Sequence, residues 1–451
     1  MQRIGNRNHW HQWQQRWQSG FSVVAIYLFA GAISPSKALA NLLLTLLLLL
    51  WLFQLFAGQS RWWLPEIRRW WVLCSGYLLL LLIAVGWGAH LWSSTPSITW
   101  QHHLDVALSL WRVPLAIGVI GWYIYLLDID IEQLCYAFVV GLLVNVGYGL
   151  LTADQVPALF NGGLRTGFLM HNPNSLGLYS AAALLILLLL PPPNRGSLVL
   201  FGVSQISRWL LWLVALIVSG LALFFSQSRS GWVAIAVVLI PLIGWLLLQQ
   251  WRQHRWLFWV ITLTFVTLLW LITPSLWQIF SSEQAALLAM WNGDWADAPS
   301  SSFGQRLQMW QLGITQWLHH PLVGLGPAGS AALLSQADNP ILREHPNLHA
   351  DLIDQLLAIG LIGVAVLYTF VFWLVQGVWR AFRSGLISLP MLLLLGGAGV
   401  IYWIDALAAF LMSRDRGFFY LALFGGMALS LTWRIAQDDS ALRAQQVDDS
   451  V

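Results

Sequence analysis

Residues 38–58 read "ALANLLLTLLLLLWLFQLFAG", a run of 21 residues without a charged side chain. A helix rises about 1.5 Å per residue, so about 20 apolar residues cross the hydrocarbon core of a bilayer. The whole chain of 451 residues is 58% hydrophobic and 9% charged, with a mean hydropathy of +0.68. Soluble domains carry about 25% charged residues. The sequence therefore predicts an all-α fold, that of a polytopic integral membrane protein.

Similar apolar runs predict twelve transmembrane helices in total. They lie at residues 20–35, 38–58, 70–90, 104–126, 134–152, 174–191, 208–226, 231–249, 256–274, 350–376, 386–411 and 417–435. The predicted organisation is a cytoplasmic tail (1–19), transmembrane helices 1–9 (20–274), a periplasmic loop (275–349), transmembrane helices 10–12 (350–435) and a second cytoplasmic tail (436–451).

The distribution of basic residues predicts the orientation of these helices. With both termini in the cytoplasm, 14 arginines fall on the inner side and 7 basic residues on the outer side, with Arg112 inside a span. Inner loops of membrane proteins carry the excess of Lys and Arg, so this orientation is favoured. Cys74 and Cys135 lie inside apolar runs and indicate no disulfide framework. The net charge of +3 gives no indication of nucleic acid binding, and none is expected.

The predicted periplasmic loop contains a candidate amphipathic helix. Residues 303–320 read "FGQRLQMWQLGITQWLHH", with apolar side chains at 307, 310, 314, 317 and 318. This spacing is typical of a helix lying on the membrane or against the bundle. Residues 320–330, "HPLVGLGPAGS", should end it, and their glycines would let the backbone approach a ligand.

Three arginines on the outer side are candidate functional residues. Arg165 belongs to "LRTGFLMHNPNSLG" (164–177), in which "NPN" can cap the following helix. Arg229 belongs to "FSQSRSGW" (225–232), a short junction between two spans, and Arg306 lies with Trp310 on the amphipathic helix. Arg229 must lie close to the bilayer surface, and its planar guanidinium group could bind a phosphate of a substrate bidentately. The alternatives are an interfacial snorkelling side chain for Arg165, an anchor on lipid phosphates for Arg229, and a solvated side chain for Arg306.

The stretch "REHPNLHADLIDQLLAIGLIG" (343–363) combines titratable groups with an apolar helix. Asn347 is predicted as the helix N-cap, which would place His349 in the first turn. There the helix dipole disfavours a charged imidazole, and a neutral imidazole is suited to act as a general base. His345 and His349, at i and i+4, could instead decorate a loop or share a metal. Because no third ligand is evident, no metal is predicted.

The order of these motifs across residues 160–375 resembles the O-antigen ligase and polymerase superfamily of bacterial envelope glycosyltransferases. The resemblance implies transfer of a glycan from an undecaprenyl-diphosphate carrier to an acceptor hydroxyl, at the periplasmic face of the inner membrane. The expected partners are this lipid-linked donor, a lipid or glycan acceptor and membrane lipids, with no metal or cofactor. Arg229 and Arg306 would hold the diphosphate, and His349 would deprotonate or orient the acceptor hydroxyl.

Further residues are expected to bind substrate, and one position departs from the family pattern. The expected substrate-binding residues are Arg165, Asn174, Trp310, Arg343 and Asp351. Ala358 stands where family members often carry a glutamate, which leaves Asp351 or Asp354 as substitutes. The motifs do not separate a ligase from a polymerase.

A secondary transporter of a small anion such as bicarbonate is the alternative. It would use polar groups near the bilayer midplane, for which Arg112 and Asp405 are the candidates. The titratable and arginine residues of the candidate motifs gather at the outer face rather than at mid-depth, which favours the enzyme.

Overall fold

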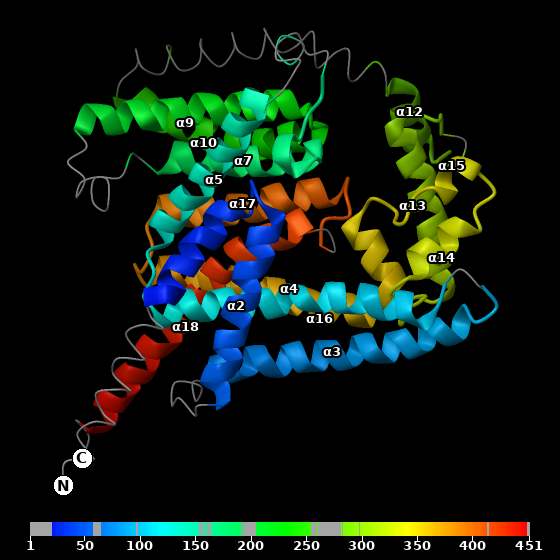
Figure 1. Cartoon of the computed structure of the whole chain (residues 1–451), viewed down its shortest axis with the longest axis horizontal. Coiled ribbons are helices and arrows are strands. Elements are labelled where there is room, and N and C mark those ends of the chain that lie inside the picture. The colour runs from blue at the N-terminus through cyan, green and yellow to red at the C-terminus, as the bar shows by residue number, and fades with distance from the viewer. Residues whose placement is uncertain are drawn as a thin grey trace.

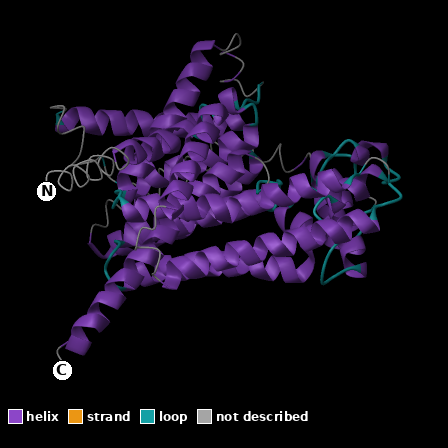
Figure 2. Cartoon of the chain, turned by 60° about the horizontal axis from the view of Figure 1, so that its bottom comes forward, coloured by secondary structure: helices purple, strands orange, loops and turns teal. Residues whose placement is uncertain are grey.

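The protein is a bundle of helices, seen in a computed structural model that describes residues 20–56, 65–95, 98–152, 157, 159, 164–190, 192, 204–253, 259, 281, 283–296, 298–412 and 415–448. Within these ranges every regular element is helical, which confirms the all-α class (Figure 2). The elements are the helix Gly20–Ala32, α2 (Lys37–Phe56), α3 (Pro65–Leu91), α4 (Trp100–Leu126), α5 (Ile131–Thr152), η2 (Phe168–Met170), α7 (Pro173–Leu189), α9 (Gln205–Ser226), α10 (Arg229–Gln253), α12 (Gln284–Asn292), α13 (Ser302–His319), α14 (Gly329–Ser335), α15 (Pro340–Arg343), α16 (Asp351–Arg383), α17 (Leu389–Ala406) and α18 (Asp415–Asp448).

Eight helices in the described part of the chain are long and apolar enough to cross a membrane. They are α2, α3, α4, α5, α9, α16, α17 and the Arg416–Ser440 part of α18. Shorter apolar helices are Gly20–Ala32, α7 and the Arg229–Gly244 part of α10. These helices confirm a polytopic membrane protein. The predicted span at 256–274 falls, apart from Trp259, outside the described residues, so the count of twelve remains a prediction.

Several helix ends differ from the sequence prediction. The helices α16 and α18 continue to Arg383 and Asp448, so most of the segment predicted as a C-terminal tail is helical. By contrast, α17 ends at Ala406 rather than at residue 411. The backbone beyond it turns away because the N–H groups of Leu411 and Met412 donate to the Asp351 carboxylate.

The segment predicted to be periplasmic forms a helical cap at one end of the bundle. Figure 1 shows α3, α4 and α9 running along the long axis, with α12–α15 gathered at the right-hand end. The C-terminal end of α18 points to the opposite, lower left, side. We call α12–α15, residues 284–343, the cap. The candidate site residues on the cap therefore lie at the end of the bundle remote from the end of α18.

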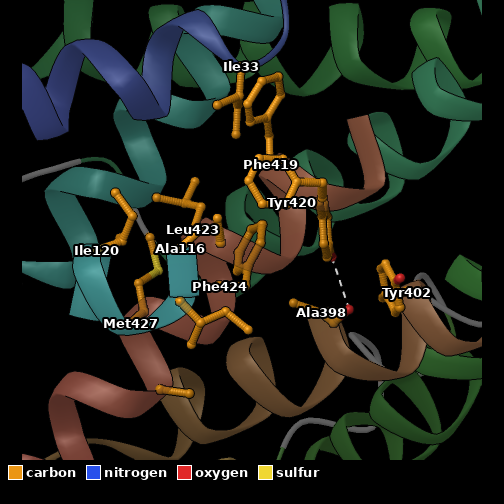
Figure 3. Packing of buried hydrophobic residues seen from close by; sticks show 14 of the residues in the cluster. Ile33, Ala116, Ile120, Ala398, Tyr402, Phe419, Tyr420, Leu423, Phe424 and Met427 are labelled. Atoms are coloured by element: carbon orange, nitrogen blue, oxygen red, sulfur yellow. Dashed lines mark hydrogen bonds between the residues drawn. The ribbon is translucent and has the colours of Figure 1, made fainter. Parts of the chain in front are cut away.

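Aromatic side chains and close backbone contacts hold the bundle together. The rings of Tyr402 and Tyr420 stack with centroids 6.0 Å apart, and the Tyr420 hydroxyl donates to the Ala398 carbonyl at 2.9 Å (Figure 3). A side chain at Gly121 would lie 3.1 Å from the Gly426 carbonyl oxygen, so α4 and α18 pack backbone to backbone. Small residues drive this kind of contact between membrane helices, since van der Waals packing replaces the hydrophobic effect there.

A break divides α16 at Gly360. This residue has φ 61° and ψ −171°, outside the helical region, so α16 consists of two helical pieces. The backbone of residues 320–330 fills the break. The N–H groups of Leu361 and Ile362 donate to the carbonyls of Pro321 (2.9 Å) and Leu322 (3.2 Å), and the Leu325 N–H donates to Leu357 at 2.5 Å. The loop thereby satisfies backbone groups that the break would otherwise leave unpaired.

The glycines of this loop approach protein backbone rather than a ligand. A Cβ atom at Gly324, which has φ 71°, would lie 2.4 Å from the Leu357 carbonyl oxygen. One at Gly326, which has φ 90°, would lie 2.4 Å from the Gly88 Cα on α3. The sequence-based interpretation of these glycines as a ligand approach is therefore corrected.

We expect Gly360→Ala to destabilise the protein by about 3 kcal/mol or more, because a left-handed conformation and a backbone clash act together. The added Cβ would lie 2.2 Å from the Leu322 carbonyl oxygen. The matched control is Gly399→Ala in α17, where a Cβ meets nothing within 4 Å. Thermal unfolding of the detergent-solubilised chain measures both variants. Equal melting temperatures for the two would contradict the importance of the break.

Candidate arginine cluster and histidine pair

The α9–α10 junction holds Arg229 against a segment that is distant in sequence. Residues 164–166 lie along the junction, since the Thr166 N–H donates to the Phe225 carbonyl at 3.1 Å. The Arg165 Nε donates to the Ser226 carbonyl at 3.0 Å. Arg229 is the first residue of α10, and its side chain is 48% exposed. The backbone contacts therefore bring Arg165 to the start of α10.

The N-terminus of α7 holds the end of the Arg165 side chain. As predicted, Asn172 is the N-cap of α7, and its side chain accepts the Asn174 N–H at 2.9 Å. The Asn174 side-chain carbonyl in turn accepts a hydrogen bond from Arg165 Nη2. Burial, and secondly the positive charge of Arg229, lower the pKa of the Arg165 guanidinium. The two guanidinium groups are thus close enough to repel each other.

Glu283 connects Arg229 to the cap. Its Oε1 lies 2.5 Å from Arg229 Nη1, and its Oε2 accepts the Ser301 hydroxyl at 2.5 Å. Ser301 is the N-cap of α13, where the helix dipole favours a carboxylate. Burial raises the pKa of Glu283, but the hydrogen bonds from Ser301 and Arg229 outweigh it and lower the pKa overall. Sequence reasoning missed this residue because its partners are distant in the chain.

We expect Glu283→Gln to destabilise the protein at pH 7 by about 1 kcal/mol or less, since Arg229 is half exposed to solvent. The folded-state pKa of Glu283 is lowered, so its contribution is present above the unfolded value of about 4.3 and is lost as the pH falls through the lower folded value. Thermal unfolding of the wild type and of Glu283→Gln, at pH 7 and at acidic pH, measures the contribution of Glu283 to stability. A difference between the variant and the wild type that grows in acid would contradict it.

Arg306 joins the same group of charges from α13. Burial is the main cause of its lowered pKa, and Arg165 and Arg229 add to that effect, while Asp405 and Glu283 oppose it. These interactions place three guanidinium groups from three separate segments within electrostatic range of one another. We call Arg165, Arg229 and Arg306 the arginine cluster.

Asp405, on α17, is the second carboxylate that interacts with the arginine cluster. It is fully buried, and its Oδ1 accepts the hydroxyl of Ser230, the neighbour of Arg229. Its Oδ2 has no hydrogen-bond partner among the described residues. The sequence shows Asp405 only as a lone carboxylate inside an apolar run, which marks it as a functional candidate without identifying its neighbours.

The structure corrects the predicted environment of His349. The helix α16 begins at Asp351 with Ala350 as its N-cap, and His349 precedes it in a left-handed conformation with φ 53°. Asn347 is not the N-cap residue of α16. Its side-chain oxygen accepts the His349 N–H at 3.2 Å. The Asp354 carboxylate instead accepts the Leu348 N–H at 3.0 Å. A position in the first turn, and the dipole argument based on it, therefore do not apply.

His345 is a direct partner of His349. The His349 Nε2 and the His345 Nδ1 are 3.2 Å apart, and the two rings meet edge to face. Which ring carries the proton depends on the tautomers. From sequence, His345 is predicted only as a loop residue or as a metal ligand. Among the residues that the structure describes, no group of three or more His, Cys, Asp or Glu side chains is arranged to hold a metal ion.

Two sets of contacts tie the His349 turn to the helices that carry Arg306 and Asp405. Trp310, one turn beyond Arg306 on α13, donates its indole N–H to the Leu348 carbonyl at 3.0 Å. Asp351 accepts the hydroxyl of Tyr402, which lies one turn before Asp405 on α17, at 3.0 Å. The turn before α16 is thus held by α13, which carries Arg306, and by α17, which carries Asp405.

Two of the predicted substrate-binding residues, Arg343 and Asp351, contact residues outside the arginine cluster. Arg343 is exposed on α15, donates from Nε to the Ala337 carbonyl at 2.6 Å, and takes part in none of the described interactions of the cluster. Asp351 is 2% exposed, and its carboxylate is engaged by Tyr402, Leu411 and Met412. Its geometry is that of an anchor between α16 and α17.

The fold and these contacts define a polytopic helical membrane protein with an arginine cluster at the capped end of its bundle. Residues 213–368 match the family described as O-antigen ligase. The matched region runs from α9 into α16 and contains Arg229, Arg306, His349 and Gly360. The resemblance to the O-antigen ligase and polymerase superfamily is thereby confirmed, and the match supports a ligase- or polymerase-like function in a bacterial inner membrane. No curated protein matches the chain.

Proposed function

We propose that the protein transfers or polymerises a glycan from undecaprenyl diphosphate onto an acceptor hydroxyl. The arginine cluster carries this proposal. Three guanidinium groups share one region with two carboxylates, Glu283 and Asp405. Partly buried like charges repel unless an anion compensates them. A diphosphate is such an anion, and guanidinium groups bind its oxygens bidentately.

The arginines would act most strongly as the bond to the carrier breaks. The departing diphosphate gains negative charge, and preorganised donors stabilise the charge that develops in a transition state. In the proposed reaction Arg229 and Arg306 contact the diphosphate, and Arg165, held by Asn174, adds a third positive charge. Binding of the diphosphate would exchange the contact of Arg229 with Glu283 for one with substrate.

His349 would take the proton of the acceptor hydroxyl as the new glycosidic bond forms. Its contact with His345 supports this role, because a neighbouring imidazole can orient the ring and share its proton. The indole N–H of Trp310 donates to the carbonyl of Leu348, the residue before His349. We therefore assign Trp310 to positioning the turn that carries His349. In the proposed topology of twelve spans the cap faces the periplasm and both termini lie in the cytoplasm.

Transport of a small anion is not supported. The family match points to a ligase or polymerase. The two charges that favoured a transporter are also engaged elsewhere: Asp405 accepts from Ser230 beside the arginine cluster, and the Arg112 guanidinium lies 4.4 Å from the centroid of the Phe418 ring.

Deletion of the gene, followed by analysis of the envelope polysaccharide, tests the proposal. A ligase predicts polysaccharide that is no longer attached to its acceptor, and a polymerase predicts attached chains of one repeat. In both cases the lipid-linked donor should accumulate, and wild-type protein should restore the product. A normal polysaccharide in the deletion strain would refute the proposal, and loss of anion uptake in that strain would favour transport.

A further inference from the structure

A carboxylate of the protein itself occupies one arginine of the cluster. Arg229 Nη1 and Glu283 Oε1 are 2.5 Å apart, a charge-assisted contact. The other oxygen of this carboxylate accepts the Ser301 hydroxyl at 2.5 Å, and the Phe303 N–H also donates to the carboxylate. The Glu283 side chain is 10% exposed, so a guanidinium, a hydroxyl and a backbone N–H surround a largely buried anion.

The donors around Glu283 are of the kinds that hold a phosphate group. Ser301 is the N-cap and Phe303 the second residue of α13, so two of the donors belong to a helix N-terminus, where anions are favoured. The guanidinium group of Arg229 adds a full positive charge and a planar pair of donors. The Glu283 carboxylate therefore lies among donors that suit a phosphate oxygen equally well.

The two partners of this contact differ in exposure. The Arg229 side chain is 48% exposed, whereas the Glu283 side chain is 10% exposed, so an anion that approaches from outside meets the guanidinium group. A carboxylate and a phosphate group carry charge of the same sign and repel each other at one guanidinium. Occupation of Arg229 by either anion therefore weakens its contact with the other.

We propose that Glu283 is an internal competitor of the diphosphate, which holds Arg229 in the empty site and helps to expel the product after transfer. This inference rests on the proposed function, because that function makes Arg229 a ligand of the diphosphate. Glu283 leaves Arg229 when the lipid-linked donor binds, and it returns when the diphosphate departs.

The chemistry of transfer creates the need for such a competitor. The acceptor oxygen forms a bond to the anomeric carbon, and its proton passes to His349. The bond from that carbon to the diphosphate oxygen breaks, and the electron pair stays on this oxygen. The product, undecaprenyl diphosphate, thus carries one more negative charge than the donor had on its diphosphate. Arginines that stabilise this charge in the transition state also hold the product more tightly than the donor. The return of Glu283 offsets that extra affinity.

Binding of undecaprenyl diphosphate to the full chain, in nanodiscs of neutral lipid, tests the competition. Glu283→Gln removes the charge and keeps the shape of the side chain, so it should bind about three- to tenfold more tightly than wild type. Glu66→Gln is the matched control, because it removes the carboxylate of another Arg–Glu pair, with Arg69 on α3, and should bind as wild type.

A second variant keeps the test decisive if Glu283→Gln does not fold. Glu283→Asp is one methylene shorter and cannot reach both Arg229 and Ser301 from the same backbone, so it should also bind more tightly than wild type. Equal or weaker binding by the folded variants would overturn the proposal, since a residue that only positions Arg229 would weaken binding when it is changed.

Product inhibition of glycan transfer tests the role in release. Undecaprenyl diphosphate should inhibit Glu283→Gln at a concentration about three- to tenfold lower than for wild type. The KM for the donor and kcat should both fall, because the donor binds more tightly and the product leaves more slowly. An unchanged inhibition constant would overturn this role. The proposed function fails by a different result, a normal envelope polysaccharide in the deletion strain, which leaves the binding measurement intact.

Discussion

Arg306→Gln should lower glycan transfer about 100- to 1,000-fold, the range seen when one preorganised donor to a developing charge is removed. Arg306 is half buried and interacts with both carboxylates and both other arginines of the site. In the proposed reaction it stabilises charge that grows on the diphosphate as the bond breaks. The loss should therefore appear in kcat more than in the KM for the donor.

Two further variants separate the chemistry of Arg306 from its charge. Arg306→Lys keeps the positive charge but loses the planar fork, so we expect it to recover only part of the activity. Arg380→Gln, exposed near the far end of α16, removes one arginine outside the cluster and should transfer normally. Full activity of Arg306→Gln, measured by the attachment of labelled glycan in isolated membranes, would remove Arg306 from the mechanism.

His349→Ala should reduce transfer about 100- to 10,000-fold, the usual contribution of a positioned general base. The side chain belongs to a short turn anchored by Trp310 and Asp351, so its removal should leave the helices in place. Binding of the lipid-linked donor should be unchanged, because the arginine cluster remains. The measurements are donor binding and transfer rate on the same purified protein.

His345 offers a graded comparison. If it orients His349, His345→Ala should cost less than His349→Ala and should change the pH profile of transfer, which a purely structural residue would not do. His319→Ala, exposed near the end of α13, is the matched control and should behave as wild type. Transfer by His349→Ala at the wild-type rate would rule out His349 as the base.

The elements that could be predicted from sequence are those whose signal is local. Asn172 and Pro173 mark the start of α7, and the apolar spacing of residues 307–317 marks α13, which packs on α16. The left-handed conformation of His349 could not be predicted, since it depends on side chains that bind the backbone around it: Asn347 binds its own N–H, and Asp354 binds that of Leu348. The same holds for the role of Asp351, whose partners lie about 50 to 60 residues away on and beyond α17.

The sequence by itself determined the class of this protein, because long uncharged runs leave the backbone no stable state in a bilayer except the helix. It also identified Arg229, Arg306 and His349 as candidates, since charged groups are rare in such a chain and each stands next to an apolar helix. Only the tertiary structure decided which charges meet. The pairing of Arg229 with Glu283, the place of Asp405 and the break at Gly360 depend on contacts between segments far apart in the chain, whose geometry is set by packing rather than by local preference.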